Sequence, residues 1–183
     1  MKGIKDTLKE KIALLRLRQG DTEAFGFIYD TYVERLYRYV YFRISDRGVA
    51  YDIVQEVFLK TWEHIVQKKA VDNLQSFLYR IAYHKVVDHY RQRERQATLI
   101  EDLSEEPAVE KRPDQGGEIE FHFLKKNINR LKPEYQDVLI LRHVEGLRPA
   151  EIASILEKEV NAVRVTLHRA IAALKELYES KRH

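Results

Sequence analysis

The strongest constraint on the fold is a helical repeat of apolar residues between residues 52 and 66. Apolar residues and one threonine recur there every three or four positions, the period of a helix with one buried face. They are Ile53, Val54, Val57, Phe58, Thr61, Trp62, Ile65 and Val66. Asp52, Gln55, Glu56 and Glu63 fall on the opposite side. The segment therefore predicts a helix that is buried on one face and polar on the other.

Composition narrows the class of protein. The 183 residues are enough for one medium domain or two small ones. The chain has no cysteine, which excludes disulfides and thiolate metal sites and fits a cytoplasmic location. We find neither a run of apolar residues long enough to cross a membrane nor a signal peptide. The net charge of +3 is too small to indicate a nucleic-acid partner by itself.

Similar helical periods occur on both sides of this segment. Residues 4–18 predict a short amphipathic helix with Ile4, Leu8, Ile12 and Leu15 on one side. Residues 21–44 predict a longer helix with Asp21 as N-cap and a stripe rich in tyrosine, which we interpret as core. On the other side, residues 74–95 predict a further helix, capped by Asp72 or Asn73.

The helix predicted over 74–95 carries a second, polar stripe. Its members are Arg80, His84, Asp88, Arg91 and Arg95. One interpretation is a solvated helix face with short-range ion pairs, each contributing about 0.2–0.5 kcal/mol. The other is a stripe that follows the phosphates of single-stranded DNA, with tyrosines nearby for base stacking. The pattern alone fits both.

The next segment, residues 96–118, has no helical period. It contains Pro107, Pro113 and the pair Gly116-Gly117, which predicts an exposed linker. Residues 99–118 hold seven acidic side chains against two basic ones, whereas residues 80–95 hold five basic against two acidic. A basic working surface followed by an acidic linker accounts for this asymmetry.

The C-terminal part, residues 119–183, predicts a second helical group. Pro133 begins one helix and Gly146 ends it in the left-handed conformation. A short helix over 150–156 and a longer one from Val160 have the spacing of a helix-turn-helix, with small Ala153 and apolar Val163 where the two would pack. Glu157 stands in the turn, where glycine is more usual, at a cost of about 1–2 kcal/mol if it is left-handed.

The longer of these helices also has an outer face. We expect Val163, Leu167, Ala170, Ile171 and Leu174 to point inward. Arg164, Val165, His168 and Arg169 then share the outer side. Arg148 stands at the cap of the short helix, where serine or threonine is commoner, so it departs from the motif. The outer side of such a helix can face DNA, but a small solvated bundle has the same pattern.

Catalytic chemistry is not indicated by the sequence. There is no nucleophile–base pair, phosphate-binding loop or carboxylate dyad. His84, Asp88 and His89 lie close together on one helix but lack further ligands, so we predict no metal site and no cofactor.

Two motifs resemble the same family. Asp-Ile-Val-Gln-Glu-Val-Phe-Leu-Lys-Thr-Trp at 52–62, with Phe-Leu-Tyr-Arg-Ile-Ala at 77–82, resembles the polymerase-binding and promoter-opening helices of extracytoplasmic-function sigma factors. The run from Leu131 through Glu-Ile-Ala-Ser-Ile-Leu at 151–156 to Leu-His-Arg-Ala at 167–170 resembles their promoter-reading domain. The motifs occur in the family's order and cover most of the chain.

This resemblance implies an all-α protein of two small helical domains joined by a flexible acidic linker. Residues 1–95 would bind core RNA polymerase through Asp52, Gln55 and Glu56, and the −10 strand through the stripe with Arg80, His84, Arg91 and Arg95. Residues 96–118 would be the linker. Residues 119–183 would read −35 DNA through Arg148, Arg164, Val165, His168 and Arg169.

The resemblance also implies partners. They are core RNA polymerase and promoter DNA, duplex and melted, together with the anti-sigma factor that such proteins often have. Two other functions fit the pattern. One is a stand-alone helix-turn-helix regulator, and the other is a sigma-like interaction protein that does not read promoters.

Overall fold

Helices form all the regular structure in the part of the chain that the computed structural model describes, residues 4–99 and 124–179. Side chains are described for residues 8–96 and 124–179. The expectation of an all-α fold is confirmed. Most of the predicted linker, residues 96–118, lies outside the described residues. None of the described helices is long and apolar enough to cross a membrane.

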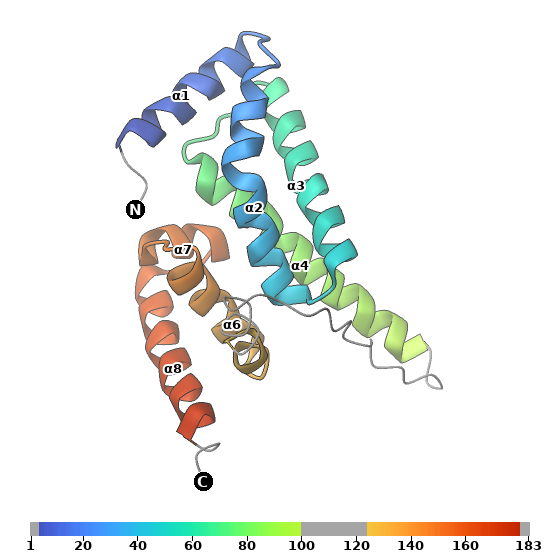
Figure 1. Ribbon diagram of the computed structural model, residues 1–183, viewed down its shortest axis with the longest axis vertical. Coiled ribbons are helices and arrows are strands. Elements are labelled where there is room, and N and C mark those ends of the chain that lie inside the picture. The colour runs from blue at the N-terminus through green and yellow to red at the C-terminus, as the bar shows by residue number, and fades with distance from the viewer. Residues whose placement is uncertain (1–3, 100–123, 180–183) are drawn as a thin grey trace, which may run out of the picture.

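The N-terminal helices α1 to α4 form one packed group (Figure 1). Their bounds are α1 Ile4–Arg18, α2 Ala24–Ile44, α3 Arg47–Val66 and α4 Leu74–Leu99. The tyrosine-rich stripe of α2 is core, as predicted, because Tyr32 and Tyr39 have no exposed area. Side-chain caps mark the turn between α2 and α3 and the turn between α3 and α4. Asp46 caps α3 by accepting from the Val49 N–H (2.9 Å), and Asn73 caps α4 by accepting from the Ser76 N–H (2.8 Å).

Three expectations about these helices are wrong. Helix α2 begins at Ala24 with Glu23 at the cap position, and Asp21 caps only the turn before it, where its Oδ1 accepts from the Glu23 N–H (3.2 Å). Helix α4 continues to Leu99, past the expected end at Arg95. Val66 is 52% exposed, because it lies about 100° around the helix from buried Ile65 and on the same side as Leu59.

The C-terminal helices follow after residues 124–128, which are also helical. They are α6 Pro133–Leu139, continued by a wide turn η1 Ile140–Val144, then α7 Pro149–Leu156 and α8 Val160–Glu179. Gly146 is left-handed as predicted, with φ of 71°. The turn between α7 and α8 is also as predicted: Glu157 is left-handed with φ of 54°, and Ala153 and Val163 are buried. Ile171, expected inside, is 37% exposed.

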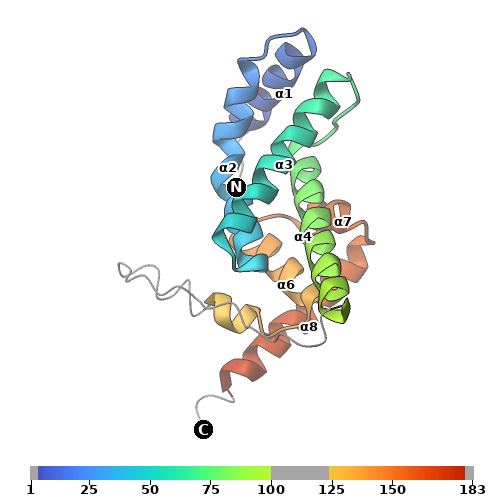
Figure 2. The same cartoon turned by 90° about the vertical axis from the view of Figure 1, so that its right-hand side faces the viewer.

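The two helical groups contact each other directly. Helix α7 packs against α4, and η1 packs against α2. Figure 2 shows α4 running alongside the C-terminal helices. This contact determines which of the predicted site residues are accessible.

Candidate functional site

The outer face of α3 carries the first group of predicted site residues. Asp52 and Glu56 are exposed, whereas Gln55 is half-buried and donates from Nε2 to the Tyr29 hydroxyl (3.4 Å). Glu56 is paired with Lys85 of α4, so its carboxylate is already partly neutralised. The three residues therefore share one surface but differ in exposure and in whether they already bond to another side chain.

Apolar side chains lie among these polar ones. Tyr51 is 56% exposed and Leu59 is 58% exposed, and both share the outer face of α3 with Val66. Exposed large apolar residues bordered by acids are typical of a protein-binding surface. Sequence reasoning missed Tyr51 and Leu59, although their helical positions beside Gln55 could have identified them.

The basic stripe of α4 is only partly accessible. His84, Arg91 and Arg95 are exposed, but Arg80 is half-buried and its Nε has no hydrogen-bond partner in the described part of the chain. Arg91 lies 3.9 Å from Asp88, a weak surface pair. The stripe can therefore offer cations to a phosphate chain mainly along its C-terminal half.

Helix α7 meets the same stripe. The His84 Nε2 lies 3.8 Å from the Glu157 carboxylate, which belongs to the turn between α7 and α8.

No group of three or more metal-ligating side chains occurs within the described ranges.

The helix-turn-helix holds the remaining predicted residues. Glu151 accepts from the backbone N–H of Arg148 (2.7 Å), which fixes the start of α7 and leaves the Arg148 side chain 80% exposed. All the predicted α8 residues are exposed: Arg164, Val165, His168 and Arg169. They stand opposite the buried line of Val163, Leu167 and Ala170, so the structure brings them together on one face.

The centre of that face includes a residue that sequence reasoning missed. At 100° per residue, Asn161, Val165 and His168 form the outermost line of α8, with Arg164 and Arg169 on its two edges. Asn161 accepts from the Arg164 guanidinium through Oδ1 (3.2 Å). Exposed amide, imidazole and guanidinium groups at the start of such a helix can bond to base edges.

A buried polar cluster joins the two helical groups. The Glu145 side chain has no exposed area and accepts from Arg35 (3.3 Å), Arg38 (2.9 Å) and the Tyr79 hydroxyl (2.5 Å). Burial and the nearby Glu145 carboxylate raise the pKa of Tyr79, so its hydroxyl remains a donor. No local pattern could have predicted these contacts, because the partners are 66 to 110 residues apart.

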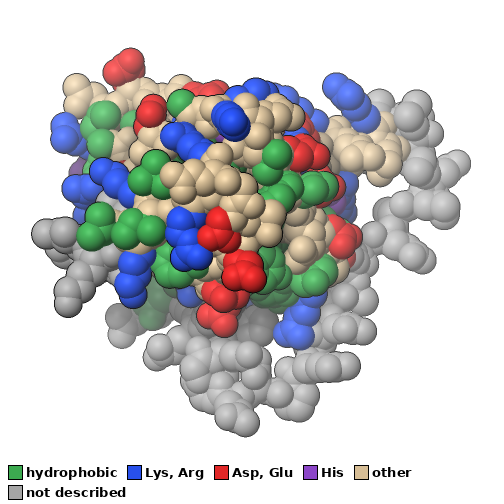
Figure 3. Space-filling model, turned by 90° about the horizontal axis from the view of Figure 1, so that it is seen from above, with side chains coloured by type: hydrophobic (Ala, Val, Ile, Leu, Met, Phe, Trp, Pro, Cys, Tyr) green, Lys and Arg blue, Asp and Glu red, His purple; other side chains and the backbone are tan. Residues whose placement is uncertain are grey.

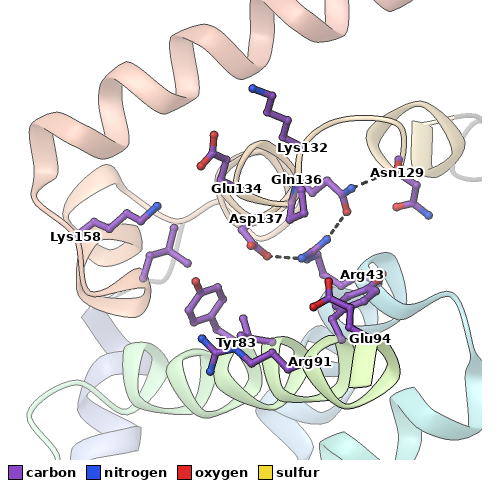
Figure 4. A pocket seen from close by; sticks show the side chains of 14 residues that line it. Arg43, Tyr83, Arg91, Glu94, Asn129, Lys132, Glu134, Gln136, Asp137 and Lys158 are labelled. Atoms are coloured by element: carbon purple, nitrogen blue, oxygen red, sulfur yellow. Dashed lines mark hydrogen bonds and ion pairs between the residues drawn. The ribbon is translucent and has the colours of Figure 1, made fainter. Parts of the chain in front are cut away.

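A second part of the cluster lies beside a cavity. Asp137 forms an ion pair with Arg43 (2.7 Å), which also donates to Gln136 (Figure 4). The Tyr39 hydroxyl donates to the same carboxylate (3.3 Å). Burial raises the pKa of the Asp137 carboxyl, and the Arg43 guanidinium acts against that shift. The cavity has a volume of about 740 Å³ and lies between α4 and the C-terminal helices.

Comparison with known proteins identifies both helical groups. Residues 28–96 match the family model for sigma-70 region 2, and residues 124–174 match the model for sigma-70 region 4. The two matched ranges contain the outer face of α3, the α4 stripe and the helix-turn-helix.

Two curated relatives and one solved structure agree. The chain is 29% identical to the ECF RNA polymerase sigma factor BldN of Streptomyces coelicolor, over 88% of this chain and 63% of BldN. It is 30% identical to the RNA polymerase sigma-E factor of the same species, over 73% of each chain. The fold is similar to that of the sigma factor RpoE in its complex with the anti-sigma factor NepR from Bartonella quintana. In that comparison the TM-score is 0.75 at 22% identity, covering 86% of this chain and 98% of RpoE.

These matches confirm the resemblance drawn from the two sequence motifs. They cover both motif regions in the expected order. The chain therefore belongs to the extracytoplasmic-function sigma factors of bacterial RNA polymerase, which direct transcription initiation.

Proposed function

We propose that residues 1–95 act as sigma domain 2 and residues 119–183 as sigma domain 4, joined by residues 96–118. In this assignment the outer face of α3 binds core polymerase. Helix α4, with the loop of residues 68–73 before it, binds the melted −10 strand. Helix α8 reads the −35 duplex, and the protein acts in the cytoplasm, where polymerase and promoter DNA are found.

One observation carries the assignment of DNA reading. The outer face of α8 presents side chains that can bond to bases or phosphates, and it is opposite the face that packs into the core. A helix-turn-helix places the exposed start of its second helix in the major groove. Arg148 at the start of α7 is exposed on the same motif and can reach a phosphate.

The polymerase surface rests on the mixed character of α3. Asp52 supplies an unpaired carboxylate in the described part of the chain, and Leu59 supplies an exposed apolar side chain near it. Apolar anchors give an interface its affinity, while charges at the rim select the partner. Gln55 and Glu56 must leave Tyr29 and Lys85 to bond fully with polymerase.

The contact between the two helical groups bears on DNA binding by α4. With the Glu157 turn beside His84, a DNA strand cannot occupy that part of the stripe. DNA binding along α4 therefore requires the C-terminal helices to move away. RpoE, the protein of similar fold, was solved with an anti-sigma factor, and we propose that this chain also has such a partner.

A reconstituted transcription assay tests the function. The chain is combined with purified core polymerase, and transcripts are mapped on genomic DNA. We expect initiation at a defined set of promoters, lost when Asp52→Lys and Glu56→Lys are combined. Glu34→Lys, a charge reversal on the exposed side of α2, is the matched control and should retain activity. Polymerase binding without initiation would favour the interaction protein. Palindromic DNA binding without polymerase would favour the stand-alone regulator.

A further inference from the structure

Helix α1 has two apolar faces, and only one of them is buried. Ala13, Leu14 and Leu17 pack against the other N-terminal helices, together with Glu10, which accepts from the Tyr32 hydroxyl (2.7 Å). The helical repeat in the sequence instead indicated the opposite side of α1, which carries Leu8, Ile12 and Leu15. The structure leaves Leu8 58%, Ile12 47% and Leu15 57% exposed.

The exposed apolar line is bordered by cations on both sides. At 100° per residue, Lys9 and Arg16 lie along one edge and Lys11 and Arg18 along the other. Only Arg16 meets a carboxylate within the described part of the chain, that of Asp21 at 2.7 Å. Glu10 is the one acidic residue among the described side chains of α1 (residues 8–18), and it is buried. The surface is therefore apolar along its middle and positive along its edges.

A groove lies next to this line, between α1 and α2. It has a volume of about 290 Å³, its lining includes the small residues Ala13 and Ala24, and Ile12 and Phe27 also line it. Lys9 and Arg16 complete its lining. Seen from the end of the molecule that carries α1, hydrophobic side chains lie beside Lys and Arg (Figure 3). Such a groove can accept one large apolar side chain of a partner.

We propose that the outer face of α1, defined by Leu8, Ile12 and Leu15 with the adjoining groove, binds an acidic amphipathic helix of a partner protein. The apolar stripe of that helix would cover Leu8, Ile12 and Leu15, and one of its side chains would enter the groove beside Phe27. Its acidic residues would meet Lys9 and Lys11. This docking does not depend on the roles proposed for α3, α4 and α8.

The charges and the shape favour this occupant over two others. A second copy of the chain packed α1 against α1 would bring the lysines of both copies together. A membrane surface would also attract these cations. Its binding strength scales with buried apolar area, however, and three side chains beside a concave groove offer little of it to a flat surface.

The test measures binding of the full chain to a fluorescent helical peptide with a leucine face bordered by glutamates. A second peptide has lysine at every glutamate position. We expect the acidic peptide to bind about tenfold or more tightly than the basic one. Leu8→Ala combined with Ile12→Ala should weaken binding about tenfold or more, and so should Lys9→Glu combined with Lys11→Glu.

Matched controls remove equivalent side chains elsewhere. Leu124→Ala removes a leucine that is 40% exposed and lies far along the chain from α1, and Lys60→Glu reverses an exposed lysine, so neither should change peptide binding. The proposal is overturned if neither peptide binds or if the two bind equally. It is also overturned if the Leu8 and Ile12 variant binds like the wild type. Binding of anionic vesicles in place of the peptide would assign the face to a membrane. Self-association that depends on Leu8 and Ile12 would assign it to a second copy.

Discussion

The buried polar cluster and the outer face of α8 are both rich in charge, yet their surroundings are opposite. Glu145 is fully enclosed and accepts from three donors, whereas His168 and Arg169 are exposed and have no partner in the described ranges. Buried charges are tolerated only when they are paired and hydrogen-bonded, so the cluster is committed to holding the structure together. On the face of α8, His168 and Arg169 keep their bonding capacity for a ligand, whereas Arg164 donates to Asn161. The comparison separates structural charge from functional charge.

The largest expected effect comes from Glu145. Glu145→Gln leaves Arg35 and Arg38 without their carboxylate, and because these arginines are 29% and 40% exposed, we expect a cost at or below the lower end of the about 3–5 kcal/mol for breaking a buried pair. Because the cluster joins the two helical groups, we expect them to separate. The chain has no cysteine, so dyes can be placed on cysteines introduced at Asp30 and Lys175. Energy transfer between the dyes should fall in the Glu145→Gln variant.

A control separates this effect from a general loss of charge. Glu176→Gln changes an exposed carboxylate on α8 and should leave energy transfer unchanged. If Glu145→Gln also leaves it unchanged, the buried cluster does not hold the two groups together.

A smaller effect is expected at Lys125, a buried cation whose ammonium lies 3.2 Å from the centroid of the Tyr41 ring. Burial, with a contribution from Arg47, lowers the pKa of Lys125 from 10.5 to about 8. Between these values the unfolded chain binds more protons than the folded one. The contribution of Lys125 to the free energy of unfolding therefore rises with pH across this window and is lost as pH falls through about 8.

Substitution of Lys125 tests whether this contribution to the free energy of unfolding rises with pH. Lys125→Met should flatten the rise and stabilise the fold at pH 7 by about 1–2 kcal/mol, allowing for solvent screening. Urea unfolding at several pH values measures both effects, and Lys126→Met on the exposed side is the control. A stability difference between the wild type and Lys125→Met that stays constant between pH 8 and 10 would contradict the assignment of this group.

The sequence predicted those features that depend on local pattern. The tyrosine core of α2, the Asn73 cap, the left-handed Glu157 and the shared outer face of α8 all follow from helical period or from single-residue preferences. The buried cluster depends on residues far apart in the chain, so no period reveals it. Helix α1 shows a further limit, because a helix with two apolar faces does not tell which one is buried.

The turn between α7 and α8 provides the third test. Glu157 has φ of 54°, and a left-handed side chain of this kind costs about 1–2 kcal/mol. Glu157→Gly should raise the free energy of unfolding by about 1 kcal/mol, because the contact to His84 at 3.8 Å is exposed and weak. Glu159→Gly, a change at a residue without positive φ, should give no gain. A loss of stability in Glu157→Gly would show that the contact with α4 outweighs the backbone strain.

The smallest effect on stability is expected on the outer face of α8. His168→Ala and Arg169→Ala should each change the free energy of unfolding by less than about 0.5 kcal/mol, because both side chains are exposed. Their effect on DNA should be larger and of two kinds. His168 lies on the outermost line of α8, so its loss should cost about 1–3 kcal/mol and relax the preference at one position of the −35 site. Arg169 lies at the edge, so its loss should weaken binding to all sequences alike.

Binding of each holoenzyme variant to a randomised −35 library distinguishes these two kinds of contact. Lys175→Ala, a change of an exposed cation further along α8, is the control for a loss of charge. If His168→Ala weakens binding to all sequences equally, His168 contacts a phosphate. If Arg169→Ala relaxes the base preference at one position of the −35 site, Arg169 reads a base. If neither variant changes binding while both fold normally, then the free charges of α8 serve another ligand. In that case the contrast with the buried cluster would mark an interaction surface rather than a promoter reader.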